Sequence, residues 1–126
     1  MPMIHVNSVD DARAFYVDKL GFDHMMGVVG SDGNLDFCTV MLDGAKIMFT
    51  RGANVVSGPP TSELYVETGD VDAYYDRVSS AGVGATQPEN MWWDDRVFIA
   101  TDLNGLKLWF YETVGPPVPP DGAKIV

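Results

Sequence analysis

The feature that most constrains the fold is a short internal repeat. The heptapeptides Asp43–Phe49 and Asn104–Phe110 follow one pattern within the 126-residue chain. Each begins with Asp-Gly or Asn-Gly, a turn dipeptide that tolerates positive φ, and continues as an alternating strand. A repeat unit this long cannot form a solenoid from two copies, and each copy would leave one apolar sheet face uncovered. The sequence therefore favours two similar modules that pack side by side.

The first module is expected to consist of a strand, a helix and three strands. A short alternating strand over 3–7 precedes Ser8, which stands three residues before Asp11 in the spacing of a capping box. Gly21 ends the helix, because glycine takes the left-handed conformation after the last turn without steric cost. Three more strands are predicted at 22–29, 36–42 and 46–51.

The second module repeats this order after a connector at 52–61, which has no periodicity and contains Gly58-Pro59-Pro60. A strand is expected over 63–67, followed by a helix that Asp70 caps and Gly82 ends. Three further strands are predicted at 83–87, 96–102 and 106–112.

This order predicts an α+β fold of two tandem βαβββ modules that form an open, cup-shaped curved sheet with helices on its outer face. A chain of 126 residues is too short for two independent domains of ordinary size, so one domain is expected over 1–113. Its modules span about 3–51 and 62–113. The Pro-rich tail 114–126 is expected to be extended, because its prolines preclude regular strand pairing.

The charge balance argues against several classes of partner. With 8 Lys+Arg against 18 Asp+Glu, the net charge of −10 repels phosphate backbones and anionic lipid surfaces, so neither nucleic acid nor a membrane is an expected partner. Cys38 is the only cysteine, which is typical of a reducing compartment. The sequence has no signal-peptide pattern and no stretch of roughly 18 apolar residues, and a cytoplasmic protein is expected.

Several motifs then occur in a characteristic order: Val6-Asn7-Ser8-Val9-Asp10, Ala14-Phe15-Tyr16, Lys19-Leu20-Gly21-Phe22, Glu63-Leu64-Tyr65-Val66-Glu67, Asp70-Val71-Asp72-Ala73, Trp93-Asp94-Asp95-Arg96 and Asp102-Leu103-Asn104-Gly105. With these motifs, the stretch from Met3 to Glu112 resembles the vicinal oxygen chelate superfamily, which includes glyoxalase I, fosfomycin- and bleomycin-resistance proteins and extradiol dioxygenases. Leu103 departs from the family, which usually has proline in an Asp-Pro-x-Gly turn.

The resemblance also implies where a metal would bind in related enzymes. Metal-dependent members place one His, Gln or Glu at each of four strand positions, which fall here on Met1, Met48, Glu63 and Trp109. A thioether is a soft, weak ligand and an indole nitrogen is only a donor, so no metal and no cofactor is predicted. His5 shares a strand face with Met1, at a position that resembles a substrate contact in glyoxalase I.

Strand alternation predicts which side chains line the cup. One face of the strands should carry Lys46, Met48 and Thr50 in the first module, and Glu63, Tyr65, Glu67, Lys107, Trp109 and Tyr111 in the second. The pair Trp92-Trp93 precedes a strand, and the resemblance places Trp93 where bleomycin-binding members carry a tryptophan ahead of an arginine such as Arg96. The predicted ligand-binding residues are His5, Met48, Glu63, Tyr65, Trp92, Trp93, Arg96, Trp109 and Tyr111.

The leading hypothesis is a metal-free protein that sequesters a planar or cationic hydrophobic compound, such as an antibiotic, in cups that a homodimer completes. Aromatic walls stack on planar rings and attract cations, and no catalytic residue is predicted. The first alternative is a metal-dependent lyase, isomerase or dioxygenase with a displaced site, or acid–base chemistry by Glu63 with His5. The second is an interaction module that makes contacts through its Pro-rich tail. The simplest interpretation of Met48, Tyr65 and Trp109 is that they only fill the interior.

Overall fold

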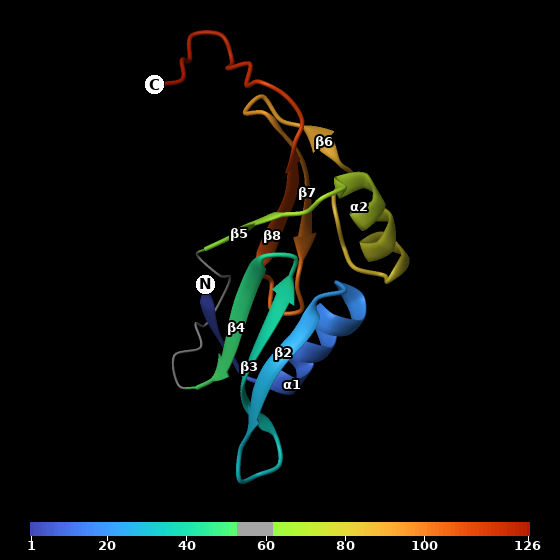
Figure 1. Ribbon diagram of the computed structural model, residues 1–126, viewed down its shortest axis with the longest axis vertical. Helices are drawn as coiled ribbons and strands as arrows, with labels where there is room; N and C mark the ends of the chain where they lie inside the picture. Colours follow the sequence, from blue (N-terminus) through green and yellow to red (C-terminus); the bar gives the residue numbers. More distant parts are fainter. Residues whose placement is uncertain (53–61) are drawn as a thin grey trace.

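The computed structural model describes residues 1–52 and 62–126, and the elements follow the repeated order (Figure 1). The first module contains β1 (Met3–Val6), α1 (Val9–Ala14), the π-helical turn η1 (Phe15–Lys19), β2 (Asp23–Val29), β3 (Leu35–Leu42) and β4 (Ala45–Arg51). The second contains β5 (Leu64–Glu67), α2 (Val71–Ser80), β6 (Glu89–Asn90), β7 (Asp95–Thr101) and β8 (Lys107–Thr113). The predicted connector 52–61 lies outside the described residues, apart from Gly52.

The two helices begin and end where the sequence predicts. The Ser8 hydroxyl accepts a hydrogen bond of 3.1 Å from the Asp11 N–H, and the Asp70 carboxylate accepts one of 3.1 Å from the Ala73 N–H. Each bond satisfies an N–H that the first turn leaves without a helical partner. Gly21 has a φ of +74°, and a Cβ added there would overlap the Arg77 guanidinium from the other module. The positive φ would strain any residue with a side chain here, and the Arg77 side chain would have to move.

The two modules have the same strand order and pairing. The sheets run β1-β4-β3-β2 and β5-β8-β7-β6, with β1 parallel to β4 and β5 parallel to β8. The other neighbouring strands are antiparallel, and both predicted hairpins form, between β3 and β4 and between β7 and β8. The α+β fold of two tandem βαβββ modules is confirmed, with one four-stranded sheet from each module.

The predicted strand at 83–87 is wrong. This segment makes one isolated bridge, between Ala85 and Ala100, and the short edge strand β6 begins only at Glu89. Gly84 has little intrinsic strand preference, and Pro88 has no N–H to donate to a ladder. Instead, the Thr86 hydroxyl accepts a hydrogen bond of 2.9 Å from the Ile99 N–H. The segment therefore follows the edge of β7 without a regular ladder.

One core joins the two modules on the helix side of the sheets. Figure 1 shows α1 and α2 on the same side, and the buried cluster between helices and sheets contains residues from both halves. The Tyr16 hydroxyl donates to the Asp102 carboxylate at 2.7 Å, and the Tyr74 hydroxyl donates to the Leu20 carbonyl at 2.7 Å. Neither helix covers the opposite faces of the sheets (Figure 1), although Thr39 and Val97 on those faces are also buried.

Two further features bear on the sequence predictions. In the ranges 1–52 and 62–126, no helix is long and apolar enough to cross a membrane. The tail from residue 114 to residue 126 contains no helix or strand, and it leaves β8 at one end of the molecule (Figure 1).

Candidate functional site

The open face of the second sheet carries the aromatic side chains that alternation predicts. On β8, Leu108 and Phe110 are fully buried in the core, so Trp109 and Tyr111 point to the opposite face. On β5, Tyr65 lies beside Trp109 in the parallel register. The first sheet repeats this pattern, because Ile47 and Phe49 are buried and leave Lys46, Met48 and Thr50 on its open face.

Three of these rings form a continuous aromatic platform. Tyr65 stacks on Tyr111 with ring centroids 4.4 Å apart and planes inclined by 23°. Its other neighbour is Trp109, whose ring is 6.4 Å away at an inclination of 35°. Offset and tilted arrangements of this kind are the ones that aromatic rings prefer, and the three rings together form an apolar surface on the open side of the sheet.

Glu63 and Trp109 contact each other directly. The Trp109 Nε1–H donates a hydrogen bond of 2.6 Å to Glu63 Oε1. The bond fixes the indole ring and holds a carboxylate at its edge. Glu63 is exposed, so this carboxylate faces solvent at the rim of the platform.

A second chain of hydrogen bonds connects Trp93 to Tyr65 and Asp95. The Trp93 Nε1–H donates to the Tyr65 hydroxyl at 2.7 Å, and that hydroxyl donates to Asp95 Oδ2 at 2.6 Å. Asp95 also accepts a bond of 3.1 Å from the Thr113 hydroxyl, and its exposed fraction is only 9%. Burial, followed by the bond to Asp95, raises the pKa of Tyr65 to about 12. The phenol therefore stays protonated and can donate at neutral pH.

These side chains line a shallow, open pocket of about 290 Å³, formed by Glu63, Leu64, Tyr65, Trp93 and Trp109. The volume is at the lower end of the range for small-molecule sites, about 300 to 1,000 Å³. Its walls are mostly apolar, with one carboxylate at the edge. Such a pocket suits a planar ring that stacks on the aromatic faces and directs a positive group or a hydrogen-bond donor toward Glu63.

Other predicted ligand-binding residues lie elsewhere. Tyr111 supports Tyr65 from the side, and Trp92 is exposed, with its ring edge-on to Trp93 at 5.5 Å. His5 and Met48 lie on the open face of the first sheet, where Met48 pairs with Met3 and His5 pairs with Thr50. The structure does not bring either of them to the pocket.

Arg96 points to the opposite side of its sheet from Trp109. It is the cross-strand neighbour of Glu112, and its guanidinium pairs with Asp72 of α2 at 3.0 Å. A further bond of 2.9 Å reaches Asn90. Because residues alternate along β7, the strand that places Phe98 in the core also directs Arg96 to the helix side, away from the pocket.

The residues at the four metal positions implied by the family do not fit a divalent ion. Met1 and Met48 offer only thioethers, and Trp109 offers only a donor. The remaining group, Glu63, has one oxygen bonded to that donor. One carboxylate alone gives too few ligands for a tight catalytic site.

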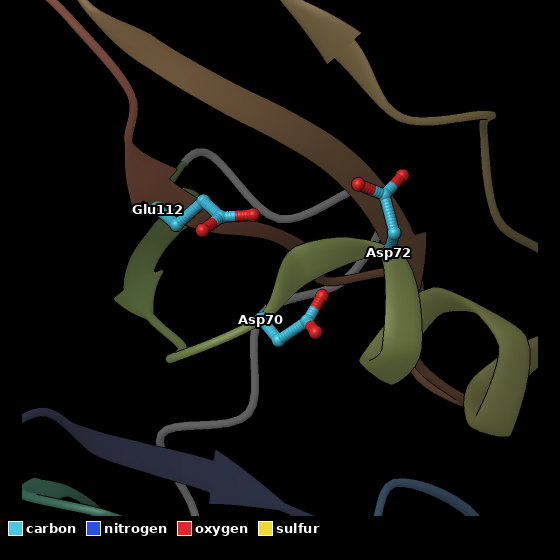
Figure 2. Close-up of side chains that lie close together, drawn as sticks. All are labelled: Asp70, Asp72 and Glu112. Atoms are coloured by element: carbon cyan, nitrogen blue, oxygen red, sulfur yellow. The ribbon is translucent and has the colours of Figure 1, made fainter.

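Within the described residues, one acidic cluster brings ligand atoms within 4.8 Å of one another: Asp70, Asp72 and Glu112. Figure 2 shows the first two at the start of α2 and the third on β8. Each carboxylate has a partner, because Asp70 caps the helix, Asp72 pairs with Arg96 and Glu112 accepts the Val71 N–H at 3.2 Å. These bonds explain the cluster without an ion.

Asp95, which links Tyr65 to Thr113, is not among the site residues that the sequence predicts. From the sequence alone, Asp94-Asp95 is expected to form a turn and not a catalytic pair, yet Asp95 is the first residue of β7 and is buried. The predicted hairpin between β7 and β8, extended to its ends, would have placed Asp95 opposite Thr113. Its bond to Tyr65 joins residues 30 positions apart, and no local pattern indicates it.

Comparisons with known proteins agree with this architecture. The chain is similar to the crystal structure of TioX from Micromonospora sp. ML1, with 21% identity, a TM-score of 0.75, and coverage of 90% of this chain and 98% of that one. TnmS3, an antibiotic binding protein from Streptomyces sp. CB03234, is 27% identical, with a TM-score of 0.66 and coverage of 88% and 93%. A bleomycin-binding protein complexed with bleomycin is 16% identical, with a TM-score of 0.72 and coverage of 90% and 96%.

No curated protein matches the chain. The family model of the Glyoxalase/Bleomycin resistance protein/Dioxygenase superfamily matches residues 2–110. This match spans both modules, so the chain belongs to the glyoxalase/bleomycin resistance protein/dioxygenase superfamily.

Proposed function

We propose that this chain is a metal-free small-molecule binding protein that sequesters a planar or cationic hydrophobic compound, such as an antibiotic. The observation that carries the proposal is the pocket in which Trp93, Tyr65 and Trp109 surround an open space beside the Glu63 carboxylate. TnmS3 is described as an antibiotic binding protein, and another similar structure contains bleomycin. Both likenesses support a ligand of this class.

The energetics of the pocket favour a flat ligand with positive charge. An aromatic pair contributes about 0.5 to 1.5 kcal/mol beyond the area it buries, and a cation over an aromatic face adds about 0.5 to 2 kcal/mol. Glu63 supplies a negative charge at the rim, and the chain as a whole carries −10. The same charge opposes nucleic acids and anionic membranes as partners.

A homodimer would give the shallow pocket its second wall. The open face of the first sheet exposes large apolar side chains, with exposed fractions of 52% for Met3, 47% for Met26 and 48% for Val28. Met3 lies on β1 and the other two lie on β2, at the two edges of this sheet, and an interface that covers this face would bury all three. A second copy of the chain, seated against the aromatic platform, would bury both surfaces. Sedimentation equilibrium is expected to show a dimer, and a monomer at all accessible concentrations would contradict this part of the proposal.

The lone, buried Cys38 fits a cytoplasmic location, where thiols remain reduced. We also infer one ligand-binding domain over 1–113, with the tail 114–126 as an appendage of the second module.

Titration of the intrinsic fluorescence with bleomycin and with mitomycin C tests the proposal. Saturable quenching at micromolar concentrations is expected, and Trp109→Ala should weaken binding at least about tenfold by removing a stacking face. Trp92→Phe is the comparison variant, because Trp92 is not one of the residues that line the pocket. Absence of binding for both compounds, or equal weakening by the two substitutions, would contradict the proposal.

Uptake of metal distinguishes this function from an enzyme of the same superfamily. After dialysis against zinc, nickel, manganese or iron, no stoichiometric metal is expected to remain bound. One tight equivalent per chain, lost in Glu63→Gln, would favour a metal-dependent lyase, isomerase or dioxygenase with a displaced site.

A further inference from the structure

The Pro-rich tail runs along the turn that carries Trp93. Its first residue, Val114, donates its N–H to the Asp94 carbonyl at 2.8 Å. Val118 donates its N–H to the Trp92 carbonyl at 2.6 Å. Figure 1 shows the tail leaving β8 beside the loop between β6 and β7. A Cβ added to Gly115 would lie 3.8 Å from the Asp94 carboxylate, so the tail backbone passes directly against this turn.

The pattern of prolines directs one donor to the turn. Over residues 116–120 the sequence is Pro-Pro-Val-Pro-Pro, and Val118 is the only one of these five residues with a backbone N–H. That N–H is the one bonded to Trp92. The prolines also reduce the number of conformations open to the detached tail, which lowers the entropy cost of docking it.

Apolar burial does not explain the position of the tail. The exposed fraction is 50% for Val114 and 72% for Val118, so neither side chain is anchored in a core. Their contacts with the turn are the two backbone hydrogen bonds. Without the Val118 donor, only the Val114 bond would hold the segment against the turn.

The turn needs support from outside itself. Asp94 has a φ of +92°, in a region that costs free energy for a residue with a side chain. The Met91 N–H bonds to the Asp95 carbonyl at 2.7 Å and closes the turn. The Trp93 indole, bonded to Tyr65, connects the turn to the pocket. Any release of the turn therefore moves one wall of the pocket.

We propose that residues 114–118, the C-terminal strap, are a positioning element that holds the Trp92–Asp94 turn and thereby sets the affinity of the pocket. The proposal rests on the proposed function for its effect on affinity, whereas the effect on the turn is independent of any ligand. Val118 is a positioning residue, and it acts through the Trp92 carbonyl and the indole of Trp93.

The test compares Val118→Pro with Val118→Ala in the full chain. The proline removes the N–H and the alanine keeps it, and both replace the exposed valine side chain. Hydrogen exchange of the Met91 amide, whose bond closes the turn, is expected to accelerate about two- to tenfold in Val118→Pro and to stay unchanged in Val118→Ala. Amides in the β7–β8 ladder should exchange as in the parent chain.

Affinity for bleomycin and mitomycin C is the second readout. Val118→Pro is expected to raise the Kd about two- to tenfold, the loss expected for one hydrogen bond, and Val118→Ala to leave it unchanged. In a Trp93→Phe background the proline should have no further effect, because the side chain it positions is then absent. Equal behaviour of the two Val118 variants, or a full effect in the Trp93→Phe background, would overturn the proposal.

The two readouts separate the strap from the proposed function. If the parent chain binds neither antibiotic but Val118→Pro still accelerates exchange in the turn, the proposed function is contradicted and the positioning role is supported. If the parent chain binds and Val118→Pro changes neither readout, the strap is contradicted and the binding function stands.

Discussion

Trp109 donates its indole N–H to the carboxylate of Glu63 at 2.6 Å. Both residues occupy positions where metal-dependent relatives are expected to carry ligands. A metal ion bound between these two positions would need an electron-pair donor from each of them. In this chain the Trp109 indole offers only an N–H, which bonds to the Glu63 carboxylate. The same contact orients a large aromatic face toward an open pocket. This pair is therefore the reason to expect a binding site that relies on stacking.

Glu63→Gln separates the charge of Glu63 from its hydrogen bond. The amide oxygen of glutamine can still accept the Trp109 N–H, so the ring is expected to stay in place. Affinity for a planar cation such as an acridine dye should fall about two- to fivefold, the range for an exposed charge interaction. Affinity for an uncharged acridone should not change, as calorimetric titration will show. An equal loss of affinity for both ligands would contradict this role of the Glu63 charge.

Tyr65→Phe should lower stability and loosen Trp93. The substitution removes the acceptor of the Trp93 indole and leaves the buried Asp95 with one donor fewer. The free energy of unfolding is expected to fall by about 1 to 2 kcal/mol in a urea titration. Tyr75→Phe is the matched control, because no hydrogen bond of the Tyr75 hydroxyl is found within 1–52 and 62–126. Similar losses for the two variants would contradict the role of the hydroxyl.

The junction of the modules depends on Asp102. Its carboxylate accepts the Tyr16 hydroxyl at 2.7 Å and the N–H groups of Asn104 and Leu106 at 2.8 and 2.9 Å. Asp102→Ala should lower the free energy of unfolding by about 3 kcal/mol, because several buried donors lose one acceptor. Tyr16→Phe removes one bond and should lower it by about 1 kcal/mol. Denaturant unfolding followed by circular dichroism measures both, and a smaller loss for Asp102→Ala would refute this ranking.

Alkaline pH should weaken the Tyr65 contribution. Its pKa is raised from the usual 10.0 to about 12, so the folded chain keeps a proton that the unfolded chain loses above about pH 10. The stabilisation is fully present below about pH 10 and is lost as the pH rises toward about 12. The difference in unfolding free energy between the parent chain and Tyr65→Phe should therefore narrow over this interval in urea titrations. A constant difference would contradict the raised pKa.

The fold could be predicted from local signals. The two turn dipeptides, Asp43-Gly44 and Asn104-Gly105, and the helix caps Ser8 and Asp70 mark boundaries through the conformation of one or two residues. Such signals require no knowledge of distant neighbours. The strand predicted at 83–87 is wrong, because a few alternating residues do not determine whether the segment pairs regularly with β7.

The site was predictable only in part. Alternation along the chain at β5 and β8 correctly grouped Glu63, Tyr65 and Trp109. The apolar residues next to them are buried in the core or pack against it, so these three side chains point to the other face. The resemblance alone assigned Arg96 to the ligand-binding site. Arg96 is two residues before the core residue Phe98, so alternation already favoured the helix side of the sheet. The place of Asp95 depends on a hydroxyl 30 residues away, which only the folded chain brings near.

Calorimetric titration of the metal-depleted protein with bleomycin and mitomycin C in the presence of EDTA, followed by elemental analysis of the complex, tests the central claim most directly. We predict saturable binding of at least one of the two compounds, no stoichiometric metal in the complex, and loss of binding in Trp109→Ala. Binding that appears only when a metal ion is restored, or that is unaffected by Trp109→Ala, would contradict a pocket that works by aromatic stacking without a metal.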